Sequence, residues 1–373
     1  MDSIPLMRPE IDEADLEAVC RVLRSGWLVQ GIEVELFEGS IAKLHEAPFG
    51  IAVSSATAGL HLAFETLGVH KGEVIFIPSF AWPSAANMAS RCGAEVVFVD
   101  VEPQSYNLCP IDLKLKIQQC LSAGKQLQGI VVVHEFGLAA DMETILATAK
   151  DKGMWVVEDA ACALGAQTPL GPVGTLGSMG IFSFHPRKSI TTGEGGCIIT
   201  KDVETDAQLR SLRNHGQVID QGKRSFGTCG WNYRLTEFQA ALGNVQLSKF
   251  QTMLSHRRVV AAWYHEYLVG VEGLQLPALD QAHTWQTFMT VLDSGISRDG
   301  LIADMKSKGV ECSIGAFAAH LLPSFNVTPT EANDDCPVST QLFNQGFSLP
   351  MHSFMDEGKV RDVSNALKAS LRD

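Results

Sequence analysis

Long apolar runs, a secretory signal and an excess of positive charge are all missing from this 373-residue sequence. No apolar stretch approaches the roughly 20 residues that a membrane-spanning helix needs, which argues against an integral membrane protein. The first residues lack the basic end and apolar run of a secretory signal. The net charge of −13 opposes attraction to nucleic acid or to an anionic membrane surface, so we expect neither as a partner.

Cysteine spacing excludes two further classes. The nine cysteines form no CxxC pair and are odd in number, which argues against a disulfide framework and a structural zinc site. Free thiols are typical of a reducing compartment, so we expect a cytoplasmic protein. The chain also lacks low-complexity tracts, and its length predicts a globular protein of about two domains.

Short apolar runs alternate with helix-length segments from about residue 50 to about residue 200. The clearest runs are GIAVSS, EVIFIPSF, EVVFVDV, GIVVVHEFG, MWVVEDAA, GIFSFHP and GGCIIT. Unbroken apolar runs are typical of strands buried on both faces. Their alternation with helices predicts an α/β domain with a mainly parallel sheet covered by helices.

Helices and a smaller alternating region account for the rest of the chain. Residues 11–24 predict an amphipathic helix because four apolar residues recur at helical spacing: Leu16, Val19, Cys20 and Leu23. Residues 234–268 read as helical. After them, TFMTVLD and VECSIG predict strands, and RDGLIADMKSKG predicts a helix. We expect a large α/β domain over residues 1–250 and a small α+β domain over residues 251–373.

The loops after the apolar runs carry the candidate site, because ligands of an open parallel sheet lie beyond the carboxyl ends of its strands. Small hydroxyl residues at 54–59 open a helix, which suits a phosphate but equally an ordinary capped helix. Glu158 and Asp159 form an acid pair after a strand. Lys188 stands among small residues, and the aromatic Trp82 follows another strand.

These four features match the groups that a single cofactor requires. Pyridoxal phosphate needs a lysine to form an imine, a carboxylate to keep its ring nitrogen protonated, a helix start for its phosphate and a flat partner for its ring. One of each is present, although each taken alone also fits an ordinary structural role. The sequence therefore predicts pyridoxal 5′-phosphate as the cofactor.

Over nearly its whole length, the chain resembles the DegT/StrS family of nucleotide-sugar aminotransferases. The resemblance is carried by RPEIDEADLEAVCRVLRSGWLVQG, SSATAGLHLA, VHEFGLAADM, VVEDAACALGA, FSFHPRKSITTGEGG, LRNHG, WNYRLTEFQAALGNVQL and GFSLPMH. It implies the aspartate-aminotransferase-like fold (PLP fold type I). It also implies a homodimer with shared active sites.

The resemblance implies a role for each matched residue of the cofactor site. Lys188 resembles the Schiff-base lysine, Asp159 the carboxylate that pairs with the pyridinium, and Trp82 the ring that stacks on the cofactor. Phosphate contacts are implied for three positions: Ser183, Ala56 and Thr57.

Asn232 and two departures from the family pattern complete the set. Asn232 matches an asparagine that family members send into the neighbouring subunit, where it touches the cofactor phosphate. Ala56 stands where the family usually has Gly. Cys162 stands where the family commonly has Gln or His, and a thiol is a weak hydrogen-bond donor toward the cofactor's ring hydroxyl.

An acidic chain needs local basic groups to hold a nucleotide diphosphate. The segment between LRNHG and WNYR is rich in glycine, which predicts a mobile loop. In or beside it lie three candidate substrate contacts: Arg213, Lys223 and Arg224. Surface solvation is the alternative role for Lys223 and Arg224. His185 is a further candidate, with a packed or hydrogen-bonded role as its alternative.

The reaction implied by the resemblance moves an amino group from glutamate onto a nucleotide-linked keto sugar. The HPxK and TTGEGG blocks look more like those of members that act on 4-keto-6-deoxy sugars than those that act at C3. The alternatives are a sugar 3-aminotransferase, a sugar dehydratase, which in related enzymes has His in place of Lys188, and a regulatory protein without turnover. The sequence leaves open the sugar, the nucleotide and the stereochemistry of the new amine.

Overall fold

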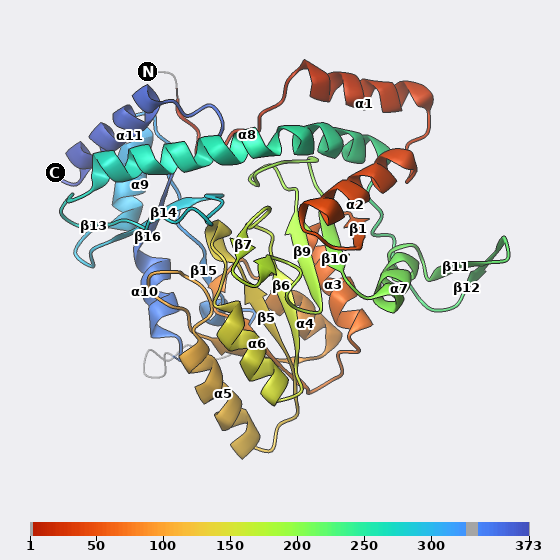
Figure 1. Ribbon diagram of the computed structural model, residues 1–373. Helices are drawn as coiled ribbons and strands as arrows, with labels where there is room; N and C mark the ends of the chain where they lie inside the picture. The colour runs from red at the N-terminus through yellow and green to blue at the C-terminus, as the bar shows by residue number, and fades with distance from the viewer. Residues whose placement is uncertain (1–2, 326–334, 373) are drawn as a thin grey trace.

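A seven-stranded sheet lies at the centre of the computed structural model, which describes residues 3–325 and 335–372 (Figure 1). Its spatial order is β1-β10-β9-β6-β5-β2-β4. The strands are β1 (Phe49–Val53), β2 (Val74–Pro78), β4 (Glu95–Val99), β5 (Leu127–Val133), β6 (Trp155–Asp159), β9 (Met179–Ser183) and β10 (Gly196–Thr200). Strand β10 runs antiparallel to β1 and β9, whereas the other neighbours are parallel. The predicted mainly parallel sheet is confirmed.

Helices cover both faces of this sheet. Side chains alternate between the faces along each strand, so Ile75 and Ile77 join one core cluster while Val74 and Phe76 join another. The first face is covered by α3 (Ala56–Thr66), α4 (Ser84–Cys92) and α7 (Val203–Arg213). The second face is covered by α2 (Ile32–Leu44), α5 (Pro110–Ser122), α6 (Met142–Asp151) and the first half of α8 (Glu237–Leu268).

The 32-residue helix α8 joins the large sheet to a smaller unit (Figure 1). Its residues Phe250 and Leu254 pack in the core of the large sheet, whereas Val260 and Leu268 pack in a separate core. The predicted boundary at residue 250 lies within this helix, and the domain limits stay a prediction. The smaller unit contains β13 (Leu274–Gln275), β14 (Phe288–Leu292), α9 (Arg298–Ser307), α10 (Pro337–Gln345), β16 (Gly346–Leu349) and α11 (Glu357–Ser370).

One predicted strand is absent, and one predicted helix forms with part of its apolar face exposed. The expected strand VECSIG makes isolated bridges instead, from Val310 to Ile4 and from Ser313 to Ser348. Helix α1 (Glu13–Ser25) forms as expected, but its predicted apolar stripe faces solvent in the single chain. Leu16 and Leu23 are about half exposed, because Ala18 and Val22 make the contact with α8 instead.

The glycine-rich segment after α7 forms a hairpin, which corrects the expected mobile loop. Strands β11 (Gln217–Asp220) and β12 (Lys223–Phe226) pair antiparallel and project from the body of the molecule (Figure 1). Gln221 and Gly222 both have positive φ, as a two-residue hairpin turn requires. Short elements complete the chain: β3 (Phe80–Ala81), η1 (Glu135–Gly137), β7 (Gln167–Thr168), β8 (Gly171–Pro172), β15 (Phe317–Ala318) and η2 (Ala319–Leu321).

Within residues 3–325 and 335–372, we find no helix that combines the length and the apolar character needed to cross a bilayer.

Candidate active site

Six strands of the large sheet run in one direction and end at the same edge: β1, β2, β4, β5, β6 and β9. The candidate site is built on that edge, from residues that follow five of these strands. These residues at or just past the strand ends are Ser55, Ser79, Glu135, Asp159 and Ser183.

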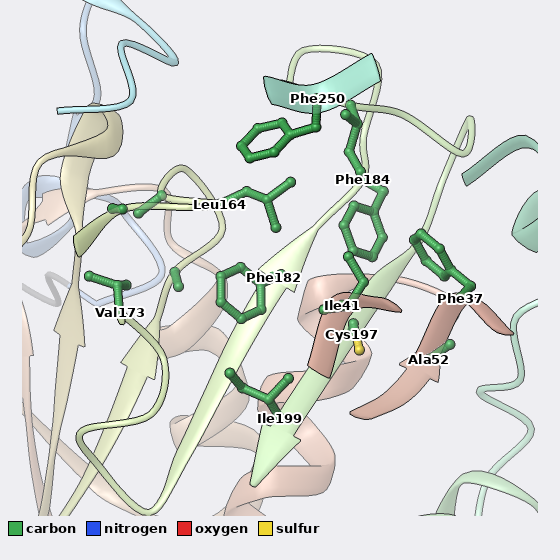
Figure 2. Close-up of a cluster of buried hydrophobic side chains, with 14 of the residues drawn as sticks. Phe37, Ile41, Ala52, Leu164, Val173, Phe182, Phe184, Cys197, Ile199 and Phe250 are labelled. Atoms are coloured by element: carbon green, nitrogen blue, oxygen red, sulfur yellow. The ribbon is translucent and has the colours of Figure 1, made fainter. Parts of the chain in front are cut away.

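The loop that carries Lys188 is fixed on both sides of the lysine. It connects β9 to β10, and its residues Phe184 and Ile190 are buried. The Phe184 ring packs edge-on against Phe37 of α2, with 5.0 Å between ring centroids, inside the cluster of Figure 2. From the smaller unit, Gln286 Nε2 donates a hydrogen bond to the carbonyl of Arg187 at 2.8 Å. The position of Lys188 is therefore set by the core and by the second unit together.

The amine of Lys188 lies in a cluster of acidic groups. Its Nζ donates a hydrogen bond to Cys162 Sγ at 3.0 Å. Burial by itself would lower the pKa of Lys188, but Cys162, Glu135 and Asp159 raise that pKa by more, so the ammonium form is favoured. Burial raises the pKa of Cys162, which keeps it a thiol whose sulfur accepts the bond. The residue that departs from the family pattern is thus the direct partner of Lys188.

Asp159 is a buried carboxyl at the end of β6, with 7% of its surface exposed. Its Oδ1 accepts a hydrogen bond from the Ala161 amide at 3.1 Å. Burial raises the pKa of Asp159, while the Ala161 amide and Lys188 partly offset that effect. A buried carboxyl in this state is stabilised by an added cation, which is what a pyridinium nitrogen supplies.

Glu158, the other member of the acid pair, accepts hydrogen bonds within the protein through both of its carboxylate oxygens. Its Oε2 lies 3.1 Å from His134 Nε2 and also accepts the Gly174 amide at 2.7 Å. The Ala140 amide donates to His134 Nδ1, so Nε2 carries the proton and donates to Glu158. The Leu176 and Gly177 amides both donate to Glu158 Oε1 at 2.7 Å. These bonds fit the structural role expected for it.

The start of α3 forms a cradle beside β10. Ser55 caps the helix by accepting the Ala58 amide at 3.1 Å, and other amides of a first helical turn point outward without helix partners. A Cβ at Gly196 would lie only 2.6 Å from Ala56 N, so this close approach requires glycine. Thr57 Oγ1 lies 3.2 Å from Ser84 Oγ. This amide-rich corner fits a phosphate group.

Ser183 and Asn232 flank this cradle through neighbouring segments. Ser183 ends β9, and its Oγ lies 3.5 Å from the His185 amide. The Ser54 amide donates to the carbonyl of Tyr233 at 2.8 Å, which holds Asn232 next to the start of α3. The Asn232 side chain is exposed.

Trp82 follows β3 and is 66% exposed in the single chain. Its ring contacts Phe317 of the smaller unit edge-on, with 5.6 Å between centroids. Strand β3 itself pairs with β15, so the smaller unit holds this part of the site. The Trp82 ring remains free on its other sides to accept a flat partner.

The four candidate substrate residues occupy different environments. Arg213 is buried, and its Nη1 donates to Glu38 Oε1 at 2.5 Å and to the Ala52 carbonyl at 2.6 Å, which braces β1. Lys223 and Arg224 are exposed on β12 of the hairpin. His185 Nδ1 accepts the Arg187 amide at 3.2 Å. Arg213 and His185 are therefore engaged within the protein, while Lys223 and Arg224 are accessible.

Sequence reasoning missed Glu135, which is 5% exposed and belongs to the electrostatic cluster of Lys188 and Asp159. The available signal was an acid placed directly after the apolar run GIVVV, at a strand end. It also missed Thr284, whose hydroxyl donates to the carbonyls of Gly137 and Cys162 at 3.3 and 3.4 Å.

Comparisons with known proteins agree with this geometry. A model of the DegT/DnrJ/EryC1/StrS aminotransferase family matches residues 9–368. The aminotransferase TlmJ from Streptoalloteichus hindustanus is 28% identical, with a TM-score of 0.91 over 99% of both chains. S. venezuelae DesV, crystallised in complex with a ketimine intermediate, is 28% identical, with a TM-score of 0.88 over 99% of this chain and 98% of that one.

A more distant structure supports the fold. Helicobacter pylori PseC, an aminotransferase involved in the biosynthesis of pseudoaminic acid, is 22% identical and covers 100% of both chains with a TM-score of 0.92. Together with the family match, these likenesses confirm the expected aspartate-aminotransferase-like fold.

Proposed function

Because this chain belongs to the DegT/DnrJ/EryC1/StrS aminotransferase family, we propose that it is a pyridoxal-phosphate-dependent enzyme that transfers the amino group of glutamate to a nucleotide-linked keto sugar. The observation that carries the proposal is the placement of the Lys188 amine. It lies 3.0 Å from Cys162 Sγ and within electrostatic reach of Asp159, at the edge of the sheet where the α3 cradle also lies.

The residues of the site would divide the work of the reaction. Lys188 Nζ would hold the cofactor covalently and, once the amino donor had freed it, would accept and return the proton that moves during the transfer. Asp159 keeps the ring nitrogen protonated. Ser55, Ala56 and Thr57 at the start of α3 hold the phosphate. When bound, pyridoxal phosphate supplies an electron sink for the negative charge that forms as that proton leaves.

The finer substrate assignment rests on resemblance. The family's HPxK and TTGEGG blocks, present here around Lys188, favour a 4-keto-6-deoxy sugar as the amino acceptor. Lys188 itself weighs against a dehydratase, because that reaction type does without this lysine. A nucleotide diphosphate on the sugar would bring negative charge to the exposed Lys223 and Arg224.

We propose further that the enzyme is a homodimer with Asn232 at the shared site. A dense group of large apolar side chains between residues 16 and 36 is exposed in the single chain: Leu16, Leu23, Trp27, Leu28, Val29, Ile32 and Leu36. Exposed apolar patches of this kind mark interaction sites. The Leu28 carbonyl accepts the Glu237 amide at 3.0 Å, so this patch adjoins the start of α8, close to Asn232 in the chain.

The test is a panel of nucleotide-linked keto sugars incubated with glutamate and the purified enzyme, with products identified by mass. A 4-keto-6-deoxy sugar should gain the mass change of keto-to-amine exchange, with 2-oxoglutarate formed in equal amount. The Lys188→Ala variant is the control and should form neither product. Loss of water from the sugar without amination would support the dehydratase instead.

A further inference from the structure

The two aromatic neighbours of Asn232 are bound to α3 by side chains that the proposed reaction, as described so far, does not use. Trp231 Nε1 donates a hydrogen bond to Glu65 Oε2 at 2.9 Å. The Tyr233 hydroxyl lies 3.0 Å from His61 Nδ1. The other ring nitrogen of His61, Nε2, lies 3.6 Å from Glu65 Oε1. These four side chains form one connected group, which we call the α3 anchor: His61, Glu65, Trp231 and Tyr233.

Ring packing closes the α3 anchor. The rings of Trp231 and Tyr233 stack, with 5.6 Å between centroids and 7° between planes. The centroid of the His61 ring lies 4.9 Å from that of Trp231 and 5.9 Å from that of Tyr233. The Tyr233 hydroxyl can donate to Nδ1 of His61 while the proton on Nε2 faces Glu65, so each polar group has a partner. The anchor is therefore both packed and hydrogen-bonded.

The segment that carries Asn232 is extended, and its main chain is also held in place. Asn232 makes an isolated antiparallel bridge to Asn214. Side chains alternate along an extended chain, so Trp231 and Tyr233 share the face toward α3, while the exposed Asn232 takes the other. Three backbone hydrogen bonds add to this: from Trp231 to the Leu212 carbonyl at 2.7 Å, from Tyr233 to the Arg213 carbonyl at 3.0 Å and from Ser54 to the Tyr233 carbonyl at 2.8 Å. The anchor thus fixes the backbone from which Asn232 projects.

Helix α3 contributes to two sites in the proposed dimer. Its first turn, which begins after Ser55, forms the amide-rich cradle for the phosphate of its own subunit. His61 and Glu65 lie further along the helix on one face, because residues four apart on a helix are neighbours. They reach the segment of Asn232, which serves the phosphate of the neighbouring subunit in the proposed function.

We propose that His61 and Glu65 are positioning residues for the neighbouring active site. Through Trp231 and Tyr233 they hold Asn232 where its side-chain amide donates a hydrogen bond to the cofactor phosphate of the partner subunit. This role rests on the proposed function, in which Asn232 serves the shared site, whereas the α3 anchor itself does not.

The first test compares two ligands of the cofactor-free enzyme by absorbance titration: pyridoxal phosphate, and pyridoxal, which lacks the phosphate. In Glu65→Ala, the dissociation constant for pyridoxal phosphate should rise about three- to tenfold, because a hydrogen bond to a charged group is misaligned. The dissociation constant for pyridoxal should stay unchanged. Glu65→Gln keeps an oxygen that accepts from Trp231, so it should retain most of the wild-type affinity for pyridoxal phosphate. Equal weakening of both ligands in Glu65→Ala would show a merely structural role and overturn the proposal.

A matched pair of tyrosine variants checks the other half of the α3 anchor. Tyr233→Phe removes the hydroxyl that faces His61 but keeps the stacked ring, and it should weaken the binding of pyridoxal phosphate alone. Tyr267→Phe is the control, since it removes a hydroxyl of the smaller unit that donates to Glu357 Oε1 at 2.6 Å. Its affinity for both ligands should equal that of wild type. Wild-type affinity in both Tyr233→Phe and Glu65→Ala would overturn the proposal.

Hybrid dimers identify the subunit on which Glu65 acts. They are purified through a different affinity tag on each chain, and the cofactor bound at Lys188 is fixed with borohydride and counted by mass spectrometry over a range of cofactor concentrations. When Lys188→Ala and Glu65→Ala are on different chains, the remaining lysine site receives Asn232 from the chain with intact Glu65, so its affinity should match wild type. When both changes are on one chain and the other chain is wild type, that affinity should fall as in Glu65→Ala. The reverse pattern would place the action of Glu65 in its own subunit and contradict the proposal.

Asn232→Ala separates this inference from the proposed function. In the same titrations it should weaken the binding of pyridoxal phosphate at least as much as Glu65→Ala does, and leave pyridoxal unaffected. If Asn232→Ala has this effect and Glu65→Ala does not, only the positioning role fails. If Asn232→Ala has no effect, the shared site of the proposed function fails, and the positioning role fails with it.

Discussion

Asp159 and Glu158 are neighbours at the end of β6, and the pleat of the strand sends their side chains to opposite faces of the sheet. Val157, on the same side as Asp159, packs in the core under α3 and α4, while Val156 packs in the core under α5 and α6. Both carboxylate oxygens of Glu158 accept hydrogen bonds, from His134 and from backbone amides, so Glu158 is unavailable to a ligand. Asp159 keeps a carboxyl oxygen for one.

Asp159→Asn should lower turnover by about tenfold or more while changing glutamate binding little, because the lost charge matters when carbanion charge develops. Steady-state kinetics and a glutamate titration check this. Burial raises the pKa of Asp159, so the fold favours its neutral form and is penalised above that pKa. The cofactor-free variant should therefore be more stable than wild type at neutral pH. Near-normal turnover would contradict the role of Asp159.

Some residues of the site could be identified from the sequence, whereas Glu135 could not. Lys188, Asp159 and the start of α3 could be identified because each follows an apolar run, and the end of such a run predicts the end of a strand. Glu135 meets the same criterion, yet its turn is tied to Cys162 by the hydroxyl of Thr284, about 150 positions later. Contacts between such distant segments have no local sequence signal.

At the scale of elements, the phosphate cradle depends on the close approach of β10 to the start of α3. Gly196 of β10 lies against Ala56 N and the Phe182 carbonyl, where a Cβ would come within 2.6 and 2.9 Å. Gly193 and Gly196 belong to the same TTGEGG block, but a Cβ at Gly193 would meet no atom within 4 Å. Of these two glycines, Gly196 is required by packing, whereas positive φ is the constraint at Gly193.

Gly196→Ala should destabilise the fold by about 1–3 kcal/mol through overpacking, and it should weaken cofactor binding because the cradle must open. Urea unfolding and cofactor titration measure the two effects. Gly39→Ala is the matched control, since Gly39 lies within α2 and a Cβ there meets no atom within 4 Å. It should leave cofactor binding unchanged and stabilise the helix by roughly 0.5–1 kcal/mol. Equal cofactor affinity in both variants would refute the cradle.

The hairpin is the element that local reasoning misread. The glycines at 216, 222, 227 and 230 suggested a loop, whereas the decisive signal was the Gln221-Gly222 pair between two extended stretches. Lys223 faces Asp220 across the turn, and Arg224 faces Ile219. A hairpin presents basic groups at a more defined position than a mobile loop would.

Replacing Lys223 and Arg224 with alanine should raise the Michaelis constant for the sugar nucleotide roughly three- to thirtyfold, because exposed charge pairs contribute up to about 1 kcal/mol each. The glutamate half-reaction should remain nearly unchanged, which stopped-flow absorbance would show. The double variant Lys114→Ala/Lys150→Ala removes two exposed lysines from α5 and α6 as a control. Equal effects on both half-reactions would mean that other residues hold the diphosphate.

At the scale of the whole molecule, the large sheet and the small unit were predictable and their junction was not. The apolar runs predicted the strands of the large sheet. The helical stretch after them, followed by a second alternating region, predicted the small unit. Helix α1 forms as predicted, and Leu16 and Leu23 of its apolar stripe are about half exposed in the single chain. In the proposed dimer that stripe would be covered by a second copy.

Mixed dimers test the shared site. Lys188→Ala and Asn232→Asp should each be inactive alone, the second because a carboxylate would repel the cofactor phosphate. After subunit exchange, hybrids should regain activity, since one of their two sites would contain neither change. About one quarter of wild-type activity is expected from random mixing, because half the dimers are hybrids with one intact site. Demonstrated hybrids without recovery would place Asn232 in its own subunit's site or outside it.

The most direct measurement for the central claim is the identification of the lysine that binds the cofactor. Borohydride reduction of the yellow enzyme, followed by digestion and peptide mass spectrometry, fixes the lysine–cofactor bond and locates it. We predict that the added mass lies on Lys188 in the FSFHPRKSITTGEGG segment and that Lys188→Ala is colourless. A cofactor found on another lysine, or a Lys188→Ala variant that keeps its colour and its transamination, would contradict the account.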